Sequence, residues 1–283
     1  MGNIRGLEYL TNLEYLKLQR TNLEKIHSLP EVNNSLKILD LSNNNLSKIE
    51  NLEHFSNLEE LYLSNNEIDT IQNLNSLKNL KKLSLTHNRI IKIEGLSQLQ
   101  RLEELNLNNN KITSIENLDE LKNLKNLNLS FNEIKLIENL DSLYNLNRLY
   151  LNNNKIKKIE GLDNLILLKG LYLSDNHIET IENLDQLIEL RKLELSDNKI
   201  KEIKGLNNLE KLQELFLDNN IIKEIKGMKN LKSLIILFLK SNEISHFRPE
   251  LVEPLPNLNF IFLNDNPLDT QSKICYNNRT RYP

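Results

Sequence analysis

The sequence predicts an α/β repeat solenoid, a right-handed curved horseshoe with one parallel β-sheet on its concave side. Three observations predict this fold. A pattern of leucines recurs every 22 residues, without insertion or deletion, from Leu36 to Leu234. A short alternation of apolar and polar residues opens each repeat, and an asparagine follows that opening at a fixed distance. Self-similarity at a period of roughly 20–50 residues is typical of stacked repeats that bury their apolar faces on one another.

The opening of each repeat predicts a short strand. In Leu61-Tyr62-Leu63 the two leucines point to one side and the tyrosine to the other, as side chains of a strand do. The rest of the repeat must hold two turns, so we expect only short 3₁₀ or irregular segments between the strands. Strands of successive repeats are therefore expected to stack in parallel, with right-handed crossovers between them.

One asparagine in each repeat has a structural explanation. Its amide can satisfy backbone groups of the bend that leaves the strand, in its own coil and in the next. We therefore expect these side chains to form a buried ladder. The asparagines are Asn44, Asn66, Asn88, Asn110, Asn132, Asn154, Asn176, Asn198, Asn220, Asn242 and Asn266.

A second recurring position, just before the sixth apolar residue of the repeat, is occupied only by asparagine or glycine. These two residue types enter the left-handed backbone region at the least cost. We therefore predict a positive φ in every coil at Gly6, Asn51, Asn73, Gly95, Asn117, Asn139, Gly161, Asn183, Gly205 and Gly227.

The motif LxxLxLxxNxI, seen at Leu102, Leu105, Leu107, Asn110 and Ile112, resembles the repeat of the leucine-rich repeat family. The resemblance covers about residues 4–268. The repeat length and the continuation IxxIExL resemble one class in particular, typified by regulatory subunit 7 of protein phosphatase 1. The resemblance implies a binding scaffold, and in its most specific form a regulatory subunit for a serine/threonine phosphatase catalytic subunit.

The repeats divide the chain into three parts. Residues 1–12 correspond to the closing half of a coil, residues 13–268 to a solenoid of about 12 repeats, and residues 269–283 to a short polar tail. The first full coil has Thr21 in place of the ladder asparagine and an extra residue near Pro30, so we expect this end to fray first. The tail is not expected to form the helical cap that often closes such solenoids.

Composition excludes several classes of function. The net charge is −3 and the acidic and basic residues are interleaved, which argues against a nucleic-acid groove. The sequence contains no run of 18 apolar residues, so it predicts no membrane-spanning helix. The N-terminus lacks an apolar signal segment. One cysteine excludes internal disulfides and favours the cytoplasm, or the nucleus in a eukaryotic cell. No motif indicates an enzyme, a metal site or another cofactor, and we expect a monomer.

The residues that point outward from the strands carry the functional information, because the fold dictates the inward ones. From Tyr150 onward these positions become aromatic, and four of the seven phenylalanines fall among them. Aromatic clusters surrounded by charge mark protein-binding sites. We predict a site for a folded protein at Tyr150, Tyr172, Glu194, Phe216, Asp218, Ile236, Phe238, Phe260 and Phe262. The phosphatase-regulator class grips its enzyme with acidic and aromatic residues of the concave side, which Glu194, Phe216 and Phe238 match.

Other interpretations stay open. The protein's own tail can cover the last aromatics, above all Phe260 and Phe262, because terminal strands need shielding. We place Lys192 in the charged rim of the site, and Gly170 is expected to let a partner approach closely. The alternative function is a bacterial adhesin or host-interaction protein of internalin type. A designed, consensus-like sequence also fits the strict spacing.

Overall fold

The computed structural model of the protein describes residues 12–26 and 35–279, the last two of them by their backbone alone. Contacts divide the chain into two units, one of Met1–Ile134 with Glu138–Leu146 and one of Lys135–Ile137 with Asn147–Pro283. The partial coil expected at residues 1–12 falls, except for its last residue, outside the described residues. The irregular segment around Pro30 also lies outside them.

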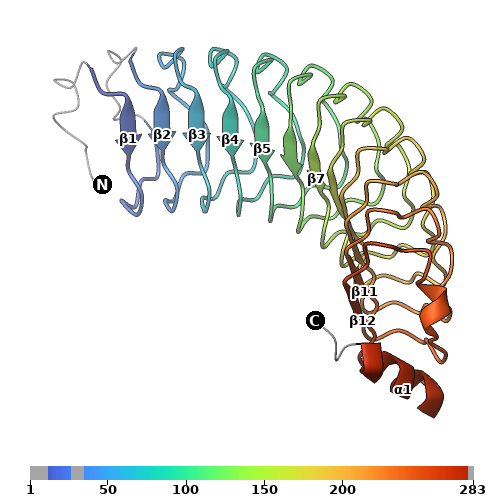
Figure 1. The fold of residues 1–283 in the computed structure, drawn as a ribbon. Helices are drawn as coiled ribbons and strands as arrows, with labels where there is room; N and C mark the ends of the chain where they lie inside the picture. Colours follow the sequence, from blue (N-terminus) through green and yellow to red (C-terminus); the bar gives the residue numbers. More distant parts are fainter. Residues whose placement is uncertain (1–11, 27–34, 280–283) are drawn as a thin grey trace. The chain divides into compact units, whose positions relative to one another are not determined.

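The first unit contains strands of three residues each, and Figure 1 shows β1 to β5 side by side. The strands pair in parallel in the order of the sequence, each residue opposite the one that occupies the same place in the next repeat. They are β1 (Tyr15–Lys17), β2 (Ile38–Asp40), β3 (Glu60–Tyr62), β4 (Lys82–Ser84), β5 (Glu104–Asn106) and β6 (Asn126–Asn128).

The second unit repeats the same arrangement and ends differently. Its strands are also parallel and in sequence order, and they are β7 (Arg148–Tyr150), β8 (Gly170–Tyr172), β9 (Lys192–Glu194), β10 (Glu214–Phe216), β11 (Ile236–Phe238) and β12 (Phe260–Phe262). A 3₁₀ helix, η2 (Pro249–Leu251), interrupts the last repeat, and a helix, α1 (Thr270–Arg279), follows β12. The predicted repeat solenoid is confirmed, with its parallel strands and its low helix content.

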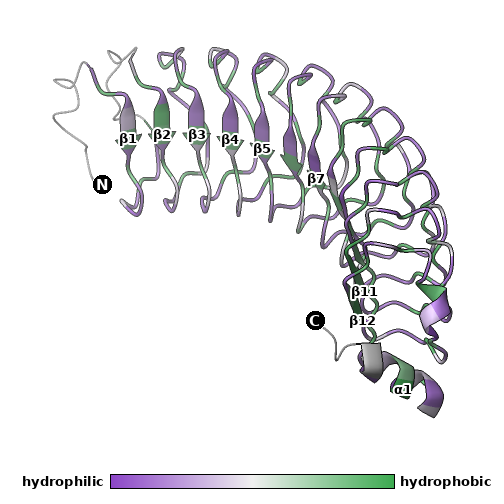
Figure 2. Cartoon of the chain, in the orientation of Figure 1, coloured by the Kyte–Doolittle hydropathy of each residue, from purple (hydrophilic) through white to green (hydrophobic). Residues whose placement is uncertain are grey.

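The core is made once per coil by the aliphatic residues of the repeat. In the coil that begins at Leu80, the seven predicted positions, ending at Leu99, are at most 1% exposed. Figure 2 shows the consequence as alternating hydrophobic and hydrophilic stretches along every coil. Each buried side chain contributes roughly 1.5–3 kcal/mol, so a coil offsets its ordering entropy only when its neighbours cover it.

The asparagine ladder is confirmed, with one difference in its direction. The Oδ1 of Asn132 accepts the backbone N–H of Ile112 at 2.9 Å, and its Nδ2 donates to the carbonyls of Leu107 and Leu129 at 3.0 Å each. The side chain thus serves its own coil and the preceding coil, whereas the sequence suggested the next. Ten of the predicted asparagines, Asn44 to Asn242, are buried. In the first coil Thr21 takes the place of the ladder asparagine. Its backbone N–H and its hydroxyl both donate to the Oδ1 of Asn44.

The predicted positive φ is present at every described position of the asparagine or glycine column, from Asn51 to Gly227. A second positive-φ column was missed. It stands one residue before the ladder asparagine and includes Asn109, Phe131, Asn153 and Asp175, with φ between 54° and 57°. Its residue types are mixed, so composition alone does not reveal the backbone requirement.

Replacing Phe131 with asparagine should stabilise the protein. Phe131 has φ 55° and is 51% exposed, so its ring gains little from packing while its backbone pays for the left-handed conformation. Asparagine enters that conformation more readily, and we expect a gain of about 0.5–1 kcal/mol in the free energy of unfolding. Urea denaturation followed by circular dichroism measures it. Phe131→Ala keeps the backbone cost and should give no such gain, so equal stabilisation by both variants contradicts this account.

The polar tail expected after the last repeat instead contains α1, which closes the end of the second unit. The hydroxyl of Tyr276 accepts the N–H of Leu263 at 3.3 Å and donates to the carbonyl of Ile261 at 3.4 Å, so it occupies the outer edge of β12. The Oγ of Ser272 accepts the N–H of Phe247 at 2.8 Å, and the rings of Phe247 and Tyr276 meet edge to face. A covered edge prevents pairing with another strand, so the helix acts as a cap.

Candidate binding surface

The three-residue strands decide which side chains are available to a partner. The middle residue of each strand of the second unit is buried and belongs to the core, while most first and third residues are at least partly exposed. Because the strands are parallel and in register, residues at the same place in successive repeats lie next to one another. A column in the sequence therefore becomes a strip on the surface.

The third positions of these strands form an aromatic strip, which we define as Tyr150, Tyr172, Phe216, Phe238 and Phe262. The rings of Tyr150 and Tyr172 stack with their centroids 4.3 Å apart and their planes at 13°. Phe216 and Phe238 stack at 4.6 Å, and Phe238 and Phe262 stack at 4.5 Å. Stacking covers the ring faces and leaves the edges for a partner. The strip is therefore a row of apolar edges in fixed positions.

Lys192 joins the two groups of stacked rings. Its Nζ lies 4.6 Å from the ring centroid of Phe216 and 5.7 Å from that of Tyr172, within cation–π range. It also pairs with the carboxylates of Glu194 at 3.0 Å and Glu214 at 3.3 Å. Burial disfavours the charge, but these two carboxylates outweigh it and hold the pKa of Lys192 above its usual value. The sequence placed Lys192 in a rim, whereas the structure puts it between the aromatic groups.

Glu194 follows Tyr172 and precedes Phe216 in the column of third positions, so it interrupts the aromatic strip. Its partner Lys192 neutralises it at the place where the ring is missing. Burial is the first cause that raises the pKa of the neighbouring Tyr172 phenol, and Tyr150 adds to it. The phenol is therefore neutral at physiological pH, and it forms a hydrogen bond with the side chain of Tyr150.

Ile236 and Phe260 extend the apolar surface at the first positions of β11 and β12, where they face each other in register. Ile236 is half-buried and Phe260 is 55% exposed. Among the described residues of α1, Tyr276 and Ser272 contact the outer edge of β12 and the backbone of Phe247. The described part of the tail therefore closes the core and leaves the ring of Phe260 exposed.

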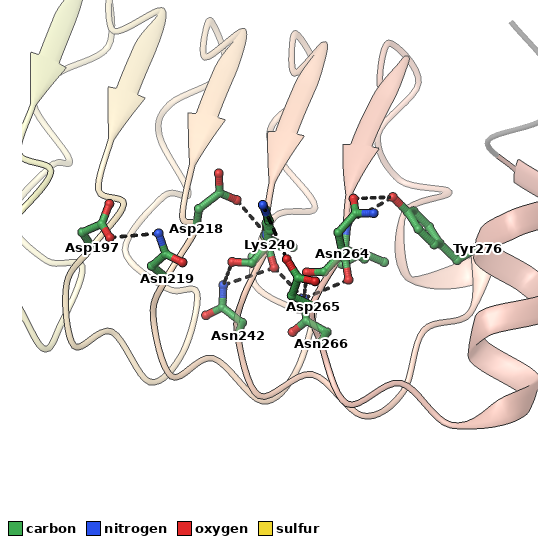
Figure 3. Close-up of polar contacts among 11 residues, drawn as sticks. Asp197, Asp218, Asn219, Lys240, Asn242, Asn264, Asp265, Asn266 and Tyr276 are labelled. Atoms are coloured by element: carbon green, nitrogen blue, oxygen red, sulfur yellow. Dashed lines mark hydrogen bonds and ion pairs between the residues drawn. The ribbon is translucent and has the colours of Figure 1, made fainter.

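Asp218 has a structural contact of its own. Its carboxylate accepts the backbone N–H of Lys240 at 2.6 Å, and the ammonium of Lys240 lies 3.5 Å from Asp265 (Figure 3). Burial raises the pKa of Asp218. The side chain of Asn152, at the same place in an earlier repeat, accepts the N–H of Ser174 in the same way. The contact is thus a feature of the repeat, and it occupies one oxygen of Asp218.

Gly170 does not provide the open approach that the sequence suggested. It is buried, and a Cβ added there would lie 2.9 Å from Cε2 and 3.1 Å from the hydroxyl of Tyr172. The missing side chain makes room for the protein's own tyrosine. The glycine thereby holds the Tyr172 ring in its position against Tyr150.

Neither a metal-ion site nor a membrane-spanning helix is found in the part of the chain that the structure describes. In residues 12–26 and 35–279 no group of three or more His, Cys, Asp or Glu side chains is placed to hold a metal ion. Within the same ranges no helix has the length and apolarity to cross a bilayer. An aromatic strip built on parallel strands, and interrupted by the ion pair of Lys192 with Glu194, defines a repeat scaffold that presents a surface.

Two family models match the chain. One is described as leucine-rich repeats in two copies and matches residues 34–76, 78–120 and 188–232. The other is described as a leucine-rich repeat and matches residues 100–195. Together with the parallel solenoid and the asparagine ladder, these matches show that the chain belongs to the leucine-rich repeat family. No curated protein sequence matches the chain.

Solved structures show the same fold. An internalin, InlF from Listeria monocytogenes, is 27% identical over 93% of this chain and 84% of its own, with a TM-score of 0.74. A second Listeria internalin, InlC2, is 31% identical over 65% of this chain and 81% of its own, with a TM-score of 0.61. A chain of an octameric complex of Latrophilin 3, Unc5D and the leucine-rich repeats of FLRT2 is 23% identical over 96% of this chain and 87% of its own, with a TM-score of 0.79.

Proposed function

We propose that the protein is a non-enzymatic scaffold that binds a folded protein partner through the aromatic strip, together with Ile236 and Phe260. The observation that carries this proposal is the stacking of Phe216, Phe238 and Phe262 beside an exposed Phe260. Aromatic side chains of this kind dominate the energetics of protein interfaces.

The strip suits a protein partner because it is organised before binding. Ring stacking and the two contacts of Lys192 restrict the side chains in advance, so little conformational entropy is lost when a partner is bound. Lys192 and Glu194 add directional hydrogen bonds at the centre. Such an arrangement combines an apolar contact area with polar groups that select one orientation of the partner.

A single-stranded nucleic acid fits this surface less well. Bases bind by stacking on open ring faces, but here each ring of the strip has at least one face covered by a neighbouring ring. Phosphate groups would also meet the carboxylates of Glu194 and Glu214 beside the single charge of Lys192. The chemistry of the strip therefore favours a protein.

Two specific versions of the proposal deserve a direct test. The 22-residue class and the residues Glu194, Phe216 and Phe238 support a regulator of a type-1 serine/threonine phosphatase catalytic subunit, in the cytoplasm or nucleus. The likeness to InlF and InlC2 supports a host-interaction protein of internalin type. The identity of the partner separates the two, since a phosphatase is an intracellular enzyme and an adhesin meets a cell-surface protein.

Removing two rings from the centre of the strip should abolish partner binding. We expect Phe216→Ala with Phe238→Ala to weaken binding by about 2 kcal/mol or more for each ring, since such aromatic anchors are hot spots. The measurement is surface plasmon resonance with a purified phosphatase catalytic subunit, alongside affinity capture from cell lysates and from cell-surface extracts with identification by mass spectrometry.

The matched control is Phe131→Ala with Tyr144→Ala, which also removes two exposed aromatic rings. It should leave binding unchanged. A phosphatase lost only by the strip variant supports the phosphatase version, and a cell-surface protein lost in the same way supports the internalin version. Equal binding by the folded strip variant and the wild type would falsify the proposed site.

A further inference from the structure

A pocket of about 640 Å³ lies in the second unit, outside the aromatic strip. Residues of the loops that leave the strands form it, and none of them is a strand residue. Its lining includes Lys135, Lys155, Lys157, Lys158, the exposed Leu136 and one carboxylate, Glu160. A volume of this size falls in the range of sites for small molecules.

The charge of the pocket is strongly one-sided. Four lysines face one glutamate, in a chain whose net charge is −3. Within residues 12–26 and 35–279, no carboxylate forms an ion pair with Lys135, Lys157 or Lys158. Exposed lysines elsewhere in the same unit do have such partners, for example Lys211 with Glu189. The positive charge of Lys135, Lys157 and Lys158 is therefore available to a ligand.

The repeat itself shows that this arrangement differs from its surroundings. Lys135, Lys157, Glu179 and Lys201 occupy the same place in four successive repeats. Glu179 and Lys201 have opposite charges and pair at 3.5 Å. Lys135 and Lys157 instead place two positive charges in adjacent coils, where both line the same pocket. Like charges in one pocket repel each other, so a bound anion would relieve the repulsion.

The pocket also has an apolar component. Leu136 is 51% exposed, and the aliphatic stems of lysines cover apolar surface while their ammonium groups reach outward. A ligand that fits both features carries a multiply charged head and an apolar part. Phosphate groups supply such a head, because they are close to doubly charged at neutral pH and offer several strong acceptor oxygens.

We propose that this pocket binds a phosphate-bearing organic anion, with its phosphates on Lys135, Lys157 and Lys158 and its apolar part on Leu136. The proposal is independent of the protein partner of the strip. The same chemistry is present in a free organic phosphate and in the headgroup of a phosphorylated lipid, so the test must separate the two sources.

The test compares inorganic tripolyphosphate with adenosine triphosphate, in which the same phosphate chain is joined through ribose to an adenine ring with apolar faces. Isothermal titration calorimetry of the full chain, without magnesium, should show one site for each probe, with affinity falling as salt is added. Lys157→Gln with Lys158→Gln should weaken both probes about tenfold or more, since two close charges are lost. Leu136→Ser should weaken adenosine triphosphate and leave tripolyphosphate unchanged.

The control variant, Lys169→Gln with Lys229→Gln, removes the same charge from exposed lysines outside the pocket. It should bind both probes as the wild type does. Absence of binding to both probes, or equal weakening by the pocket and control variants, overturns the proposal. Phosphatidylcholine vesicles with and without phosphatidylinositol bisphosphate identify the source of the phosphate. Vesicle binding that requires both the phosphorylated lipid and Lys157 assigns the site to a lipid headgroup. If the protein binds adenosine triphosphate but not these vesicles, the ligand is a free organic phosphate.

Discussion

Replacing Asn132 with alanine should lower the free energy of unfolding by about 1–3 kcal/mol, because this is the cost of a buried polar group that is left without its partner. The variant leaves the N–H of Ile112 without the amide oxygen that accepts it. It also removes one donor to the carbonyl of Leu107, which keeps the Nδ2 of Asn110 at 3.0 Å. Asn132 is buried, so water cannot readily replace the amide. Urea denaturation followed by circular dichroism measures the effect.

The matched control for this prediction is Asn207→Ala, the same chemical change at an exposed side chain. It should shift the unfolding midpoint little. Since adjacent coils depend on each other, hydrogen exchange should also show faster opening in the coils on either side of residue 132. If Asn132→Ala and Asn207→Ala have the same unfolding midpoint, the ladder is not a source of stability.

Gly205 should tolerate asparagine better than the smaller alanine. Its φ is 68°, and a Cβ added there would lie 2.5 Å from the backbone carbonyl oxygen of Ile181 in the preceding coil. Alanine therefore brings both a left-handed backbone and a contact with a backbone atom, and we expect a loss of about 2–4 kcal/mol in the free energy of unfolding. The measurement is again the urea midpoint.

Asparagine has the same Cβ but regains a hydrogen bond. At the same place in the preceding repeat, the Nδ2 of Asn183 donates to the carbonyl of Ile159 at 2.8 Å. The coil at residue 205 can adopt that arrangement, so we expect Gly205→Asn to be more stable than Gly205→Ala by about 1 kcal/mol or more. An alanine variant as stable as the asparagine variant would show that neither backbone conformation nor carbonyl contact governs this column.

The column of ladder asparagines and the column of asparagine or glycine residues with positive φ explain why the fold could be predicted from the sequence. Each coil needs one amide at the bend after the strand and one residue with positive φ at the next turn. The repeats that begin at Leu36 to Leu212 meet both needs with the same few residue types. Repetition turns a weak local preference into a pattern. The second positive-φ column was not predicted, because Phe131 and other residues of mixed type occupy it. These residue types do not indicate a left-handed backbone, although they adopt one here.

The side-chain arrangement of the candidate site could be predicted only in part, for a different reason. The sequence predicted that Phe216, Phe238 and Phe262 would lie side by side, because register follows from the repeat. It did not predict that Lys192 would reach between two groups of rings, or that Gly170 would be covered by Tyr172. Side chains at the same surface position can turn toward either neighbour, and packing decides which. The role of these residues in binding stays a prediction until the strip variant is measured.

The repeat, the inward aliphatic positions, the asparagine ladder and the place of the aromatic column can all be predicted from the order of residues in the chain. Each of these features follows from the spacing of residues along the chain, because a fixed repeat length places equivalent residues of successive coils next to one another. Only the folded chain reveals the direction of the ladder bonds, the capping contact of Tyr276 on β12 and the cluster of lysines around Leu136. These features depend on which side chains meet across coils, and that is a matter of three-dimensional distance rather than of order in the sequence.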